Sequence, residues 1–229
     1  MSIETSQVEA APSKTAAVTK KAKISSIYLF GKRSLDIIGA ILGLIISSPL
    51  FIVISIMYSF GDSKGPLFFK QQRYGKNEKL FYIYKLRSMV VNADEILKRN
   101  KVLYQKYINN NYKLEQDEDP RITRLGRILR KFSLDELPQL INVLKGEMSL
   151  VGPRPIVEEE LKEYKHKRQD LLAVKPGMTG YWQVCGRSDI GYPERVDLEL
   201  YYVYHQSMYL DIKILLRTLA VVVLKKGAY

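Results

Sequence analysis

Residues 121–155 read RITRLGRILRKFSLDELPQLINVLKGEMSLVGPRP, and the rest of the chain is most easily understood from them. The first part carries cations at every third or fourth position, which on a helix would crowd one side of the surface. These cations are Arg121, Arg124, Arg127, Arg130 and Lys131. The acidic pair Asp135 and Glu136 follows shortly afterwards. The pattern indicates a site for a negatively charged ligand, beside carboxylates that could hold a cation or attack an electrophile.

The acidic pair also has a purely structural interpretation. Ser133, with Glu136 three positions later, forms a capping-box pattern at the start of a helix. Asp135 would serve equally as the N-cap, and Pro138 would then occupy the third helical position, where its missing N–H costs nothing. Capping and chemistry are compatible, because N–H groups at a helix N-terminus also attract phosphate. The apolar run after Pro138 predicts a buried helix face.

Arg154 stands between Pro153 and Pro155. Proline restricts the residue before it to extended conformations, so the arginine is expected to be rigid and suited to bidentate phosphate binding. The alternative is a turn that simply exposes an arginine. A carboxylate combined with substrate phosphates is a usual way to hold Mg²⁺, and an aspartate can act as a nucleophile toward phosphorus.

Composition limits the function classes. The 229 residues fit one domain, with or without a membrane element. The net charge of +12 calls for an anionic partner such as nucleic acid, anionic lipid or a phosphorylated substrate. The one cysteine, Cys185, cannot form an intrachain disulfide, and two histidines offer no zinc-ligand spacing. The sequence contains no Walker loop and no recognised nucleic-acid motif, which disfavours an ATP-driven kinase and a nucleic-acid partner.

The N-terminal part predicts a membrane element. Residues 1–23 are polar and predict a disordered tail without a secretory signal, whereas residues 37–60 carry no charge and are long enough to span a bilayer. Basic residues flank the apolar run on both sides, at Lys20, Lys21, Lys23, Lys32, Arg33, Lys64, Lys70, Arg73, Lys76 and Lys79. Both ends therefore favour the cytoplasm, which predicts a re-entrant helix-break-helix turning at Ser48 and Pro49. Ser47 and Ser48 can bond the carbonyls that the proline frees, and a straight span remains the alternative.

The remaining sequence predicts a mainly helical α+β domain. The expected elements are a β-hairpin around residues 75–77, helices over 93–107, 158–170 and 193–206, a strand over 178–184, and an amphipathic helix over 212–224. The 158–170 helix is highly charged and is expected to be exposed. The 212–224 helix fits either a membrane surface or a face packed on the core. The tyrosines around it and before it fit either a core or an interfacial belt.

Several motifs together resemble the bacterial sugar transferase family, the monotopic phosphoglycosyl transferases. The motifs are KRSLD at 32–36, the Ser48-Pro49 pair, GP with FFKQ at 65–71, KLRSM at 85–89, DPRIT at 119–123, SLDELPQ to SLVGPRP at 133–155, and KPGMTGYWQVCGRSD at 175–189. The resemblance covers the chain from residue 32 to its C-terminus, and the short N-terminal tail is similar to that of the small members.

The resemblance implies a reaction and a location. Members of the family transfer a sugar 1-phosphate from a UDP-sugar to undecaprenyl phosphate and release UMP, with Mg²⁺ and a covalent phosphosugar-enzyme intermediate. They do so at the cytoplasmic face of the inner membrane, anchored by a re-entrant helix on anionic lipid. The C-terminal sequence is most similar to members that use plain hexoses for exopolysaccharide or capsule synthesis. The implied division is a tail at 1–23, a membrane segment at 24–60 and a catalytic domain at 61–229; a homodimer is left open.

The resemblance also implies roles for individual residues. Asp135 would be the nucleophile and a magnesium contact, and Glu136 its acidic partner. Arg154, Arg130 and Arg187 would bind substrate phosphate. Two other functions fit the same charges: a metal-dependent phosphohydrolase at the membrane surface, and a membrane-tethered nucleic-acid-binding protein.

Overall fold

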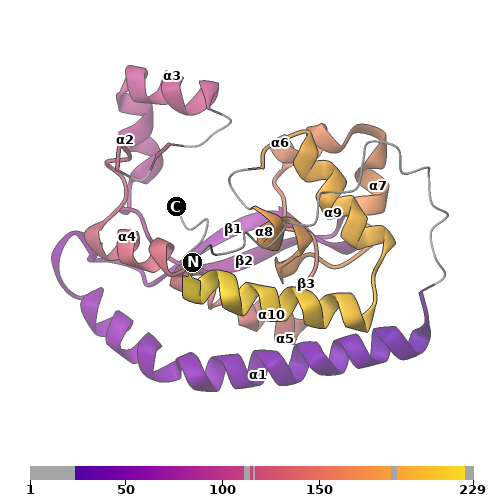
Figure 1. Cartoon of the computed structure of the whole chain (residues 1–229). Helices are drawn as coiled ribbons and strands as arrows, with labels where there is room; N and C mark the ends of the chain where they lie inside the picture. Colours follow the sequence, from indigo (N-terminus) through magenta and orange to yellow (C-terminus); the bar gives the residue numbers. More distant parts are fainter. Residues whose placement is uncertain (1–23, 111–113, 116, 187–189, 225–229) are drawn as a thin grey trace, which may run out of the picture.

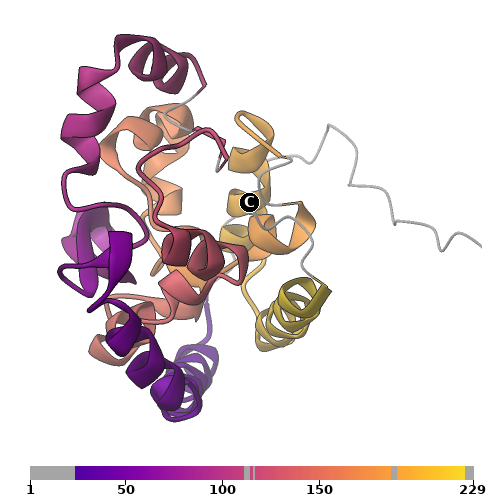
Figure 2. The ribbon, with the colours of Figure 1, turned by 90° about the vertical axis from the view of Figure 1, so that its left-hand side faces the viewer.

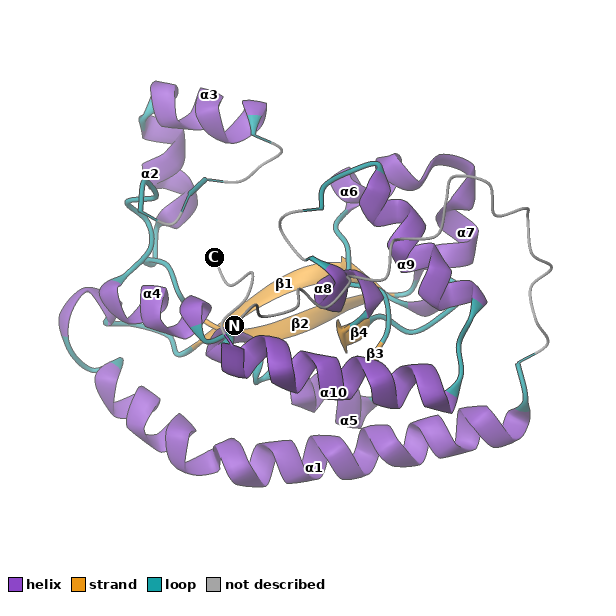
Figure 3. Ribbon diagram, viewed as in Figure 1, coloured by secondary structure: helices purple, strands orange, loops and turns teal. Residues whose placement is uncertain are grey.

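A single apolar helix, α1 (Ser26–Met57), runs along one side of the molecule and underlies the rest of it (Figure 1). The computed structural model describes residues 24–110, 114–115, 117–186 and 190–224, with side chains described up to residue 220. The predicted disordered tail over 1–23 lies outside the described residues. Helices dominate and the strands form two small sheets, so the predicted mainly helical α+β class is confirmed (Figure 3).

Helix α1 continues through Pro49 where the sequence predicted a break. Ser48 Oγ donates to the carbonyl of Ile45 at 2.8 Å, which is the carbonyl that Pro49 leaves without an N–H. Ser47 Oγ donates to the carbonyl of Gly43 at 2.7 Å. The structure therefore has one helix, bent in its second half (Figure 1), where two were predicted, because serine hydroxyls replace the bond that proline removes.

The two faces of α1 differ sharply. Its buried residues are Asp36, Ala40, Ser47 and Ile54, which share one stripe of the helix. Its exposed large apolar residues include Ile27, Phe30, Ile38, Ile41, Leu42, Ile45, Ile46, Ile52, Val53 and Ile56. The helix is long and apolar enough to cross a membrane, and most of its apolar surface is not covered by protein. This exposure suggests membrane association, because soluble domains rarely leave such a patch uncovered.

The charged residues at the start of α1 point into the protein. Lys32 Nζ donates to Asp211 Oδ2 at 2.9 Å, to the hydroxyl of Tyr202 at 2.9 Å and to the carbonyl of Val151 at 3.0 Å. The Lys32 side chain is only 13% exposed. The sequence showed this lysine only as one of the basic residues before the apolar run, and the structure places it inside the protein, paired with a carboxylate 179 positions away in the chain.

Arg33 and Asp36 make equally specific contacts. The guanidinium of Arg33 donates to the carbonyls of Val143 and Leu144 at 2.6 and 2.7 Å, at the C-terminal end of α5 (Gln139–Lys145). Cations are favourable there, since the last carbonyls of a helix lack intrahelical partners. Asp36 Oδ1 accepts from Ser149 Oγ at 2.9 Å and from the backbone N–H of Leu150 at 2.8 Å. Helix α1 is thus attached to the body by polar groups as well as by packing.

The predicted β-hairpin is confirmed, with antiparallel strands β1 (Phe68–Tyr74) and β2 (Leu80–Leu86). A second, parallel pair consists of β3 (Ser149–Val151) and β4 (Gly177–Thr179). The predicted strand over 178–184 is only partly correct. It ends at Thr179, and helix α8 (Tyr181–Cys185) follows at once.

The helix predicted over 93–107 is two helices, α2 (Ala93–Arg99) and α3 (Lys101–Asn109). Asn100 separates them in an extended conformation, and its side chain caps α3 by accepting from Leu103 N at 3.0 Å. Figures 1 and 2 show this pair as an arm that projects from the body.

The C-terminal half provides most of the core. The charged segment over 158–170 is not one exposed helix but α6 (Glu158–Leu161), a 3₁₀ segment (Lys162–Lys167) and α7 (Arg168–Leu171), with Tyr164 and Leu171 buried. They pack on α9 (Glu194–Tyr204), which Pro193 precedes at the N-cap. Tyr202 is 1% exposed, so the core interpretation holds for this tyrosine.

Helix α10 (Met208–Leu224) packs one side on the body and leaves another side exposed. Asp211 and Ile214 are buried against the body, while an opposite stripe is exposed, formed by Tyr209, Ile212, Leu216 and Leu219. Figures 1 and 2 place α10 and α1 at the same end of the molecule. Two helices therefore present apolar side chains on this side of the structure.

Asp36→Ala should destabilise the protein by about 2–4 kcal/mol, because it leaves the buried donors of Ser149 and Leu150 without an acceptor. Thermal or denaturant unfolding of purified protein would measure the loss. Ile38→Ala, on the exposed face of the same helix, is the matched control and should change stability by no more than about 0.5 kcal/mol. Equal effects of both substitutions would contradict the role given to Asp36.

Candidate active site

The acidic pair predicted from the sequence lies in its own short turn. Residues Leu134–Glu136 form a 3₁₀ segment, η3, between α4 (Arg124–Lys131) and α5. Ser133 has a left-handed backbone with φ of 54° and makes no capping hydrogen bond, and Pro138 occupies the N-cap of α5. Both capping predictions are therefore wrong. The sharp turn at Ser133 places the two carboxylates ahead of the helix rather than on its first turn.

Glu136 lies between two cations. Its Oε1 is 3.0 Å from Lys85 Nζ on β2 and 3.6 Å from Arg154 Nη1 in the loop after β3. A small pocket opens here, lined by Arg73, Ile83, Lys85, Glu136, Gln139, Arg154, Pro155, Gly177 and Met178. Three separate segments, β2, η3 and the loop after β3, thus bring charged side chains to one pocket.

Asp135 is almost completely buried, at 9% exposure. Burial raises the pKa of its carboxyl above the ordinary value, and the neighbouring charge of Glu136 raises it further. Lys85 and Arg130 act in the opposite direction. The ionised carboxylate is therefore poorly solvated and depends on these two cations, a condition that increases its reactivity toward an electrophile.

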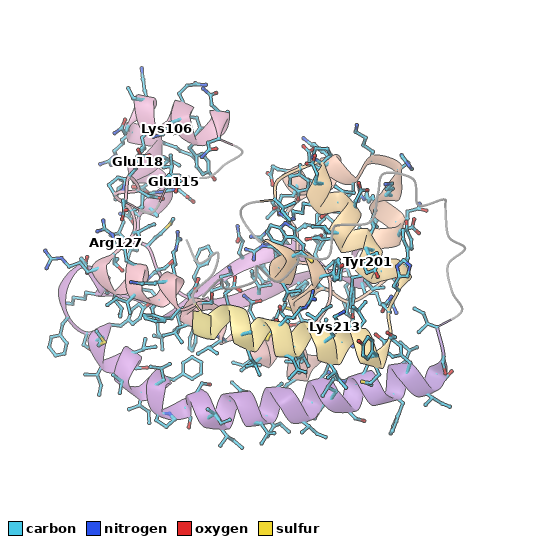
Figure 4. The ribbon with its side chains drawn as sticks, viewed as in Figure 1. Lys106, Glu115, Glu118, Arg127, Tyr201 and Lys213 are labelled. Atoms are coloured by element: carbon cyan, nitrogen blue, oxygen red, sulfur yellow. The ribbon has the colours of Figure 1, made fainter. Side chains whose placement is uncertain are left out.

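The predicted basic face of residues 121–131 does not act as one unit. Arg130 alone approaches the acidic pair, and its Nε donates to Ser88 Oγ at 2.8 Å. Burial lowers the pKa of Arg130, while the charge of Asp135 opposes this shift. Arg121 precedes α4 and forms a buried pair with Asp119 at 2.7 Å. The remaining cations, Arg124, Arg127 and Lys131, are exposed, and Figure 4 shows Arg127 on the outer side of α4.

A close backbone approach allows Arg130 to reach its position. A Cβ added at Gly126 would lie 1.9 Å from the carbonyl oxygen of Ser88, so only glycine fits at this point of α4. Thr123 caps the helix, its Oγ1 accepting from Gly126 N at 2.9 Å. The helix is therefore held tightly against the chain that follows β2.

Two backbone hydrogen bonds attach the Arg154 loop to the segment around β4. Gly152 N donates to the carbonyl of Thr179 at 2.9 Å, and Gly177 N donates to the carbonyl of Pro153 at 2.8 Å. Arg154 is 33% exposed in its side chain and faces Glu136, so it is part of the pocket and not merely the end of a turn. A partly exposed guanidinium on a fixed backbone suits an anionic ligand.

Sequence reasoning missed two cations of the pocket, Lys85 and Arg73. Lys85 follows Phe81 and Ile83 in strict alternation on β2, and that period was the available signal that it points inward. Arg187, predicted to bind phosphate, lies outside the described residues.

The donor groups at the pocket fit a divalent cation only in part. Within the described part of the chain, no cluster of three or more His, Cys, Asp or Glu side chains could hold a metal ion. Asp135 and Glu136 supply two carboxylates, and the chemistry of Mg²⁺ favours one or two carboxylates with phosphate oxygens from a substrate. The raised pKa of Asp135 is consistent with such a cation, because an added positive charge would stabilise the carboxylate.

Comparison with known proteins agrees with this geometry. Residues 27–225 match the family model described as bacterial sugar transferase. The chain belongs to the bacterial sugar transferase family. The match spans α1, the pocket and α10, so the apolar helix and the charged pocket both lie within the matched region.

Three relatives illustrate the similarity. The undecaprenyl-phosphate galactose phosphotransferase of Salmonella typhimurium is 48% identical over 91% of this chain and 43% of its own length. The UDP-galactose-lipid carrier transferase of Erwinia amylovora is 43% identical over 91% of this chain and 43% of its own length. The exopolysaccharide production protein ExoY of Sinorhizobium fredii is 43% identical over 86% of this chain and 88% of its own length. This bacterial sugar transferase therefore spans less than half of the first two relatives and most of the third.

Proposed function

We propose that this protein is a phosphoglycosyl transferase that moves a hexose 1-phosphate from a UDP-sugar to undecaprenyl phosphate and releases UMP. The step would initiate exopolysaccharide or capsule synthesis. The observation that carries the proposal is the buried carboxylate of Asp135 next to Glu136, a residue that lines a pocket together with three cationic side chains. Family membership and the activities named for the relatives support it.

In the first half-reaction, a carboxylate oxygen of Asp135 attacks the sugar-bearing phosphorus of the donor. A bond forms between that oxygen and phosphorus, and the bond to the bridging oxygen breaks. UMP leaves with the electron pair. Arg154 and Lys85 are positioned to neutralise the phosphate charges, and burial keeps the attacking carboxylate poorly solvated.

In the second half-reaction, a phosphate oxygen of the lipid attacks the aspartyl-bound phosphorus. The new phosphorus–oxygen bond forms as the bond to Asp135 breaks, and the carboxylate is regenerated. Glu136, 3.0 Å from Lys85, is positioned to accept a proton from the incoming phosphate. The near-complete burial of Asp135 keeps water from the activated intermediate.

Asp135, with Glu136 beside it, would hold Mg²⁺ together with donor phosphates. When bound, the cation would neutralise phosphate charge during transfer. The role of the protein here is to hold Glu136 in the cationic pocket with Asp135 next to it in the chain.

We also propose that α1 enters one leaflet and does not cross the bilayer. Lys32, near its start, bonds Asp211, while Ile54 and Tyr58, at its end, pack on Leu86 of β2. Both ends thus contact the same body, and a crossing helix would carry one of them to the far side. The exposed stripe of α10 would rest on the same cytoplasmic leaflet, where anionic lipid attracts the basic chain. Residues 24–60 would then form the membrane segment and 61–229 the catalytic domain.

Labelling a cysteine at position 64 tests this topology. In a Cys185→Ser background, Lys64→Cys should resist membrane-impermeant maleimide in intact cells and react after the cells are opened. Reaction from outside intact cells would show that α1 crosses the bilayer.

The activity is tested by UMP release from a panel of UDP-sugars with purified full-length protein and Mg²⁺, with and without undecaprenyl phosphate. We expect multiple turnovers only with the lipid, at most one UMP per enzyme without it, and a preference for one hexose. Sustained release without lipid would identify a phosphohydrolase that uses water as the acceptor. No release with any donor would contradict both activities.

Asp135→Asn provides the matched control, because it keeps the size of the side chain and removes the nucleophile. It should abolish UMP release while leaving the protein in the membrane fraction. Substantial turnover by this variant would rule out Asp135 as the nucleophile.

Lys85→Met should shift the pH dependence of the reaction. Lys85 lowers the pKa of Asp135, so its removal raises that pKa, and a higher pH is needed to ionise the carboxylate. The acidic limb of the kcat/KM profile should therefore move to higher pH. Lys70→Met, an exposed lysine on the same hairpin, is the control and should leave the limb where it is. An unchanged limb in Lys85→Met would show that this lysine does not tune Asp135.

A further inference from the structure

A third cation, besides Lys85 and Arg154, lines the pocket. Arg73 lies near the end of β1, its side chain is only 11% exposed, and it lines the pocket with Lys85, Glu136 and Arg154. Neither the motifs in the sequence nor the two half-reactions assign it a role. Burying an arginine costs free energy unless its charge is paired or binds a ligand. The burial of Arg73 therefore needs an explanation.

The register of the hairpin shows which way Arg73 points. Arg73 pairs with Phe81, and Gln71 pairs with Ile83. Directly paired residues share a face, and Phe81 and Ile83 are core residues at 7% and 1% exposure. The face that the hairpin turns to the core therefore carries Arg73 at one end and Lys85 at the other, in an otherwise mainly apolar surface.

Only some of the hydrogen-bond donors of the Arg73 guanidinium have partners in the described part of the protein. Its Nη2 donates to Gln71 Oε1 at 2.6 Å, and its Nη1 lies 3.3 Å from Glu160 Oε2 and 3.4 Å from the carbonyl of Pro155. Its Nε is buried without a partner among the described residues. Glu160 is also shared with Arg195, whose Nη1 lies 3.1 Å from it. Among the side chains that line the pocket, three are cationic (Arg73, Lys85 and Arg154) and one is anionic (Glu136), so the lining has more positive charge than negative.

Arg73 and Arg154 are close enough to repel each other. Burial first, and then the charge of Arg154, lower the pKa of Arg73 to about 10. Arg73 is still protonated at neutral pH at this value. Two like charges held in one pocket favour an anion placed between them, and phosphate oxygens match guanidinium geometry.

The charges divide the pocket into two ends. After burial, the charges that shift the pKa of Asp135 are those of Lys85, Glu136 and Arg130. Arg73 forms its ion pair with Glu160 at 3.3 Å, and after burial its pKa is shifted by Arg154, Glu160, Arg195 and Glu136. Glu136 contacts both Lys85 and Arg154 and so lies between the two ends. A diphosphate laid across Glu136 would place one phosphorus at Asp135 and the other at the paired arginines.

We propose that Arg73, together with Arg154, binds the nucleotide-side phosphate of the donor, the group that leaves as part of UMP. This inference rests on the proposed transferase function. As the bond to the sugar phosphate breaks, the leaving phosphate gains a second negative charge. Two guanidinium groups at this end stabilise that charge where it develops.

The test measures UMP affinity of the purified full-length protein by titration calorimetry. Arg73→Gln should weaken UMP binding about tenfold or more, the effect of losing one charge-assisted phosphate contact. Arg73→Lys keeps a cation beside Glu160 but not the planar fork, so it should weaken binding less. Lys70→Gln, an exposed lysine of β1, is the matched control and should bind UMP as the wild type does.

Thermal unfolding of each variant separates loss of binding from loss of folding. If Arg73→Gln unfolds, Arg73→Lys carries the test, and a weakened UMP affinity at unchanged Tm supports the inference. Wild-type affinity in a folded Arg73 variant overturns it while leaving the transferase activity in place. A wild-type protein that neither binds UMP nor releases it from any UDP-sugar overturns both the inference and the proposed function.

Discussion

A lysine and an aspartate of the apolar helix α1 hold the strand from which the Arg154 loop emerges. Lys32 donates to the carbonyl of Val151, and Asp36 accepts from the backbone N–H of Leu150. Arg33 holds the end of α5, whose other end follows the acidic pair. Charged groups buried this deeply are retained only when they are fully paired, so the position of α1 and the position of the pocket depend on each other.

The pocket brings charged side chains together where each is largely buried. Asp135 is buried and has two cations in its vicinity, while Glu136 shares its charge between Lys85 and Arg154. Each carboxylate at the pocket serves more than one cation, and this leaves an excess of positive charge facing the opening. An anionic ligand completes such a site, whereas an apolar ligand would leave the cations unpaired.

Local patterns in the sequence were sufficient for several parts of this structure. The turn around residues 75–77 predicted the hairpin, because a hairpin depends on neighbours in the chain. Long-range partners were not accessible in the same way. Lys32 stood out only as one of the basic residues beside the apolar run, and nothing nearby in the chain pointed to its carboxylate partner, Asp211.

Other differences arose from competition between local rules. Asn100 caps a second helix where a continuous helical pattern was expected, and the left-handed Ser133 overrode a capping box. Among the cations of residues 121–131, the spacing alone did not show which one faces the acidic pair. That choice depends on Gly126, whose missing side chain lets α4 approach Ser88 closely enough for Arg130 to bond it.

The length of α1 has a consequence for the membrane itself. A helix of 32 residues is roughly 48 Å long at 1.5 Å per residue, and its apolar side chains are exposed along most of that length. If it lies in one leaflet, as proposed, it displaces lipid in that leaflet alone and leaves the other unchanged. The protein would then act as a wedge, and its partitioning would depend on membrane curvature and on how tightly the lipids are packed.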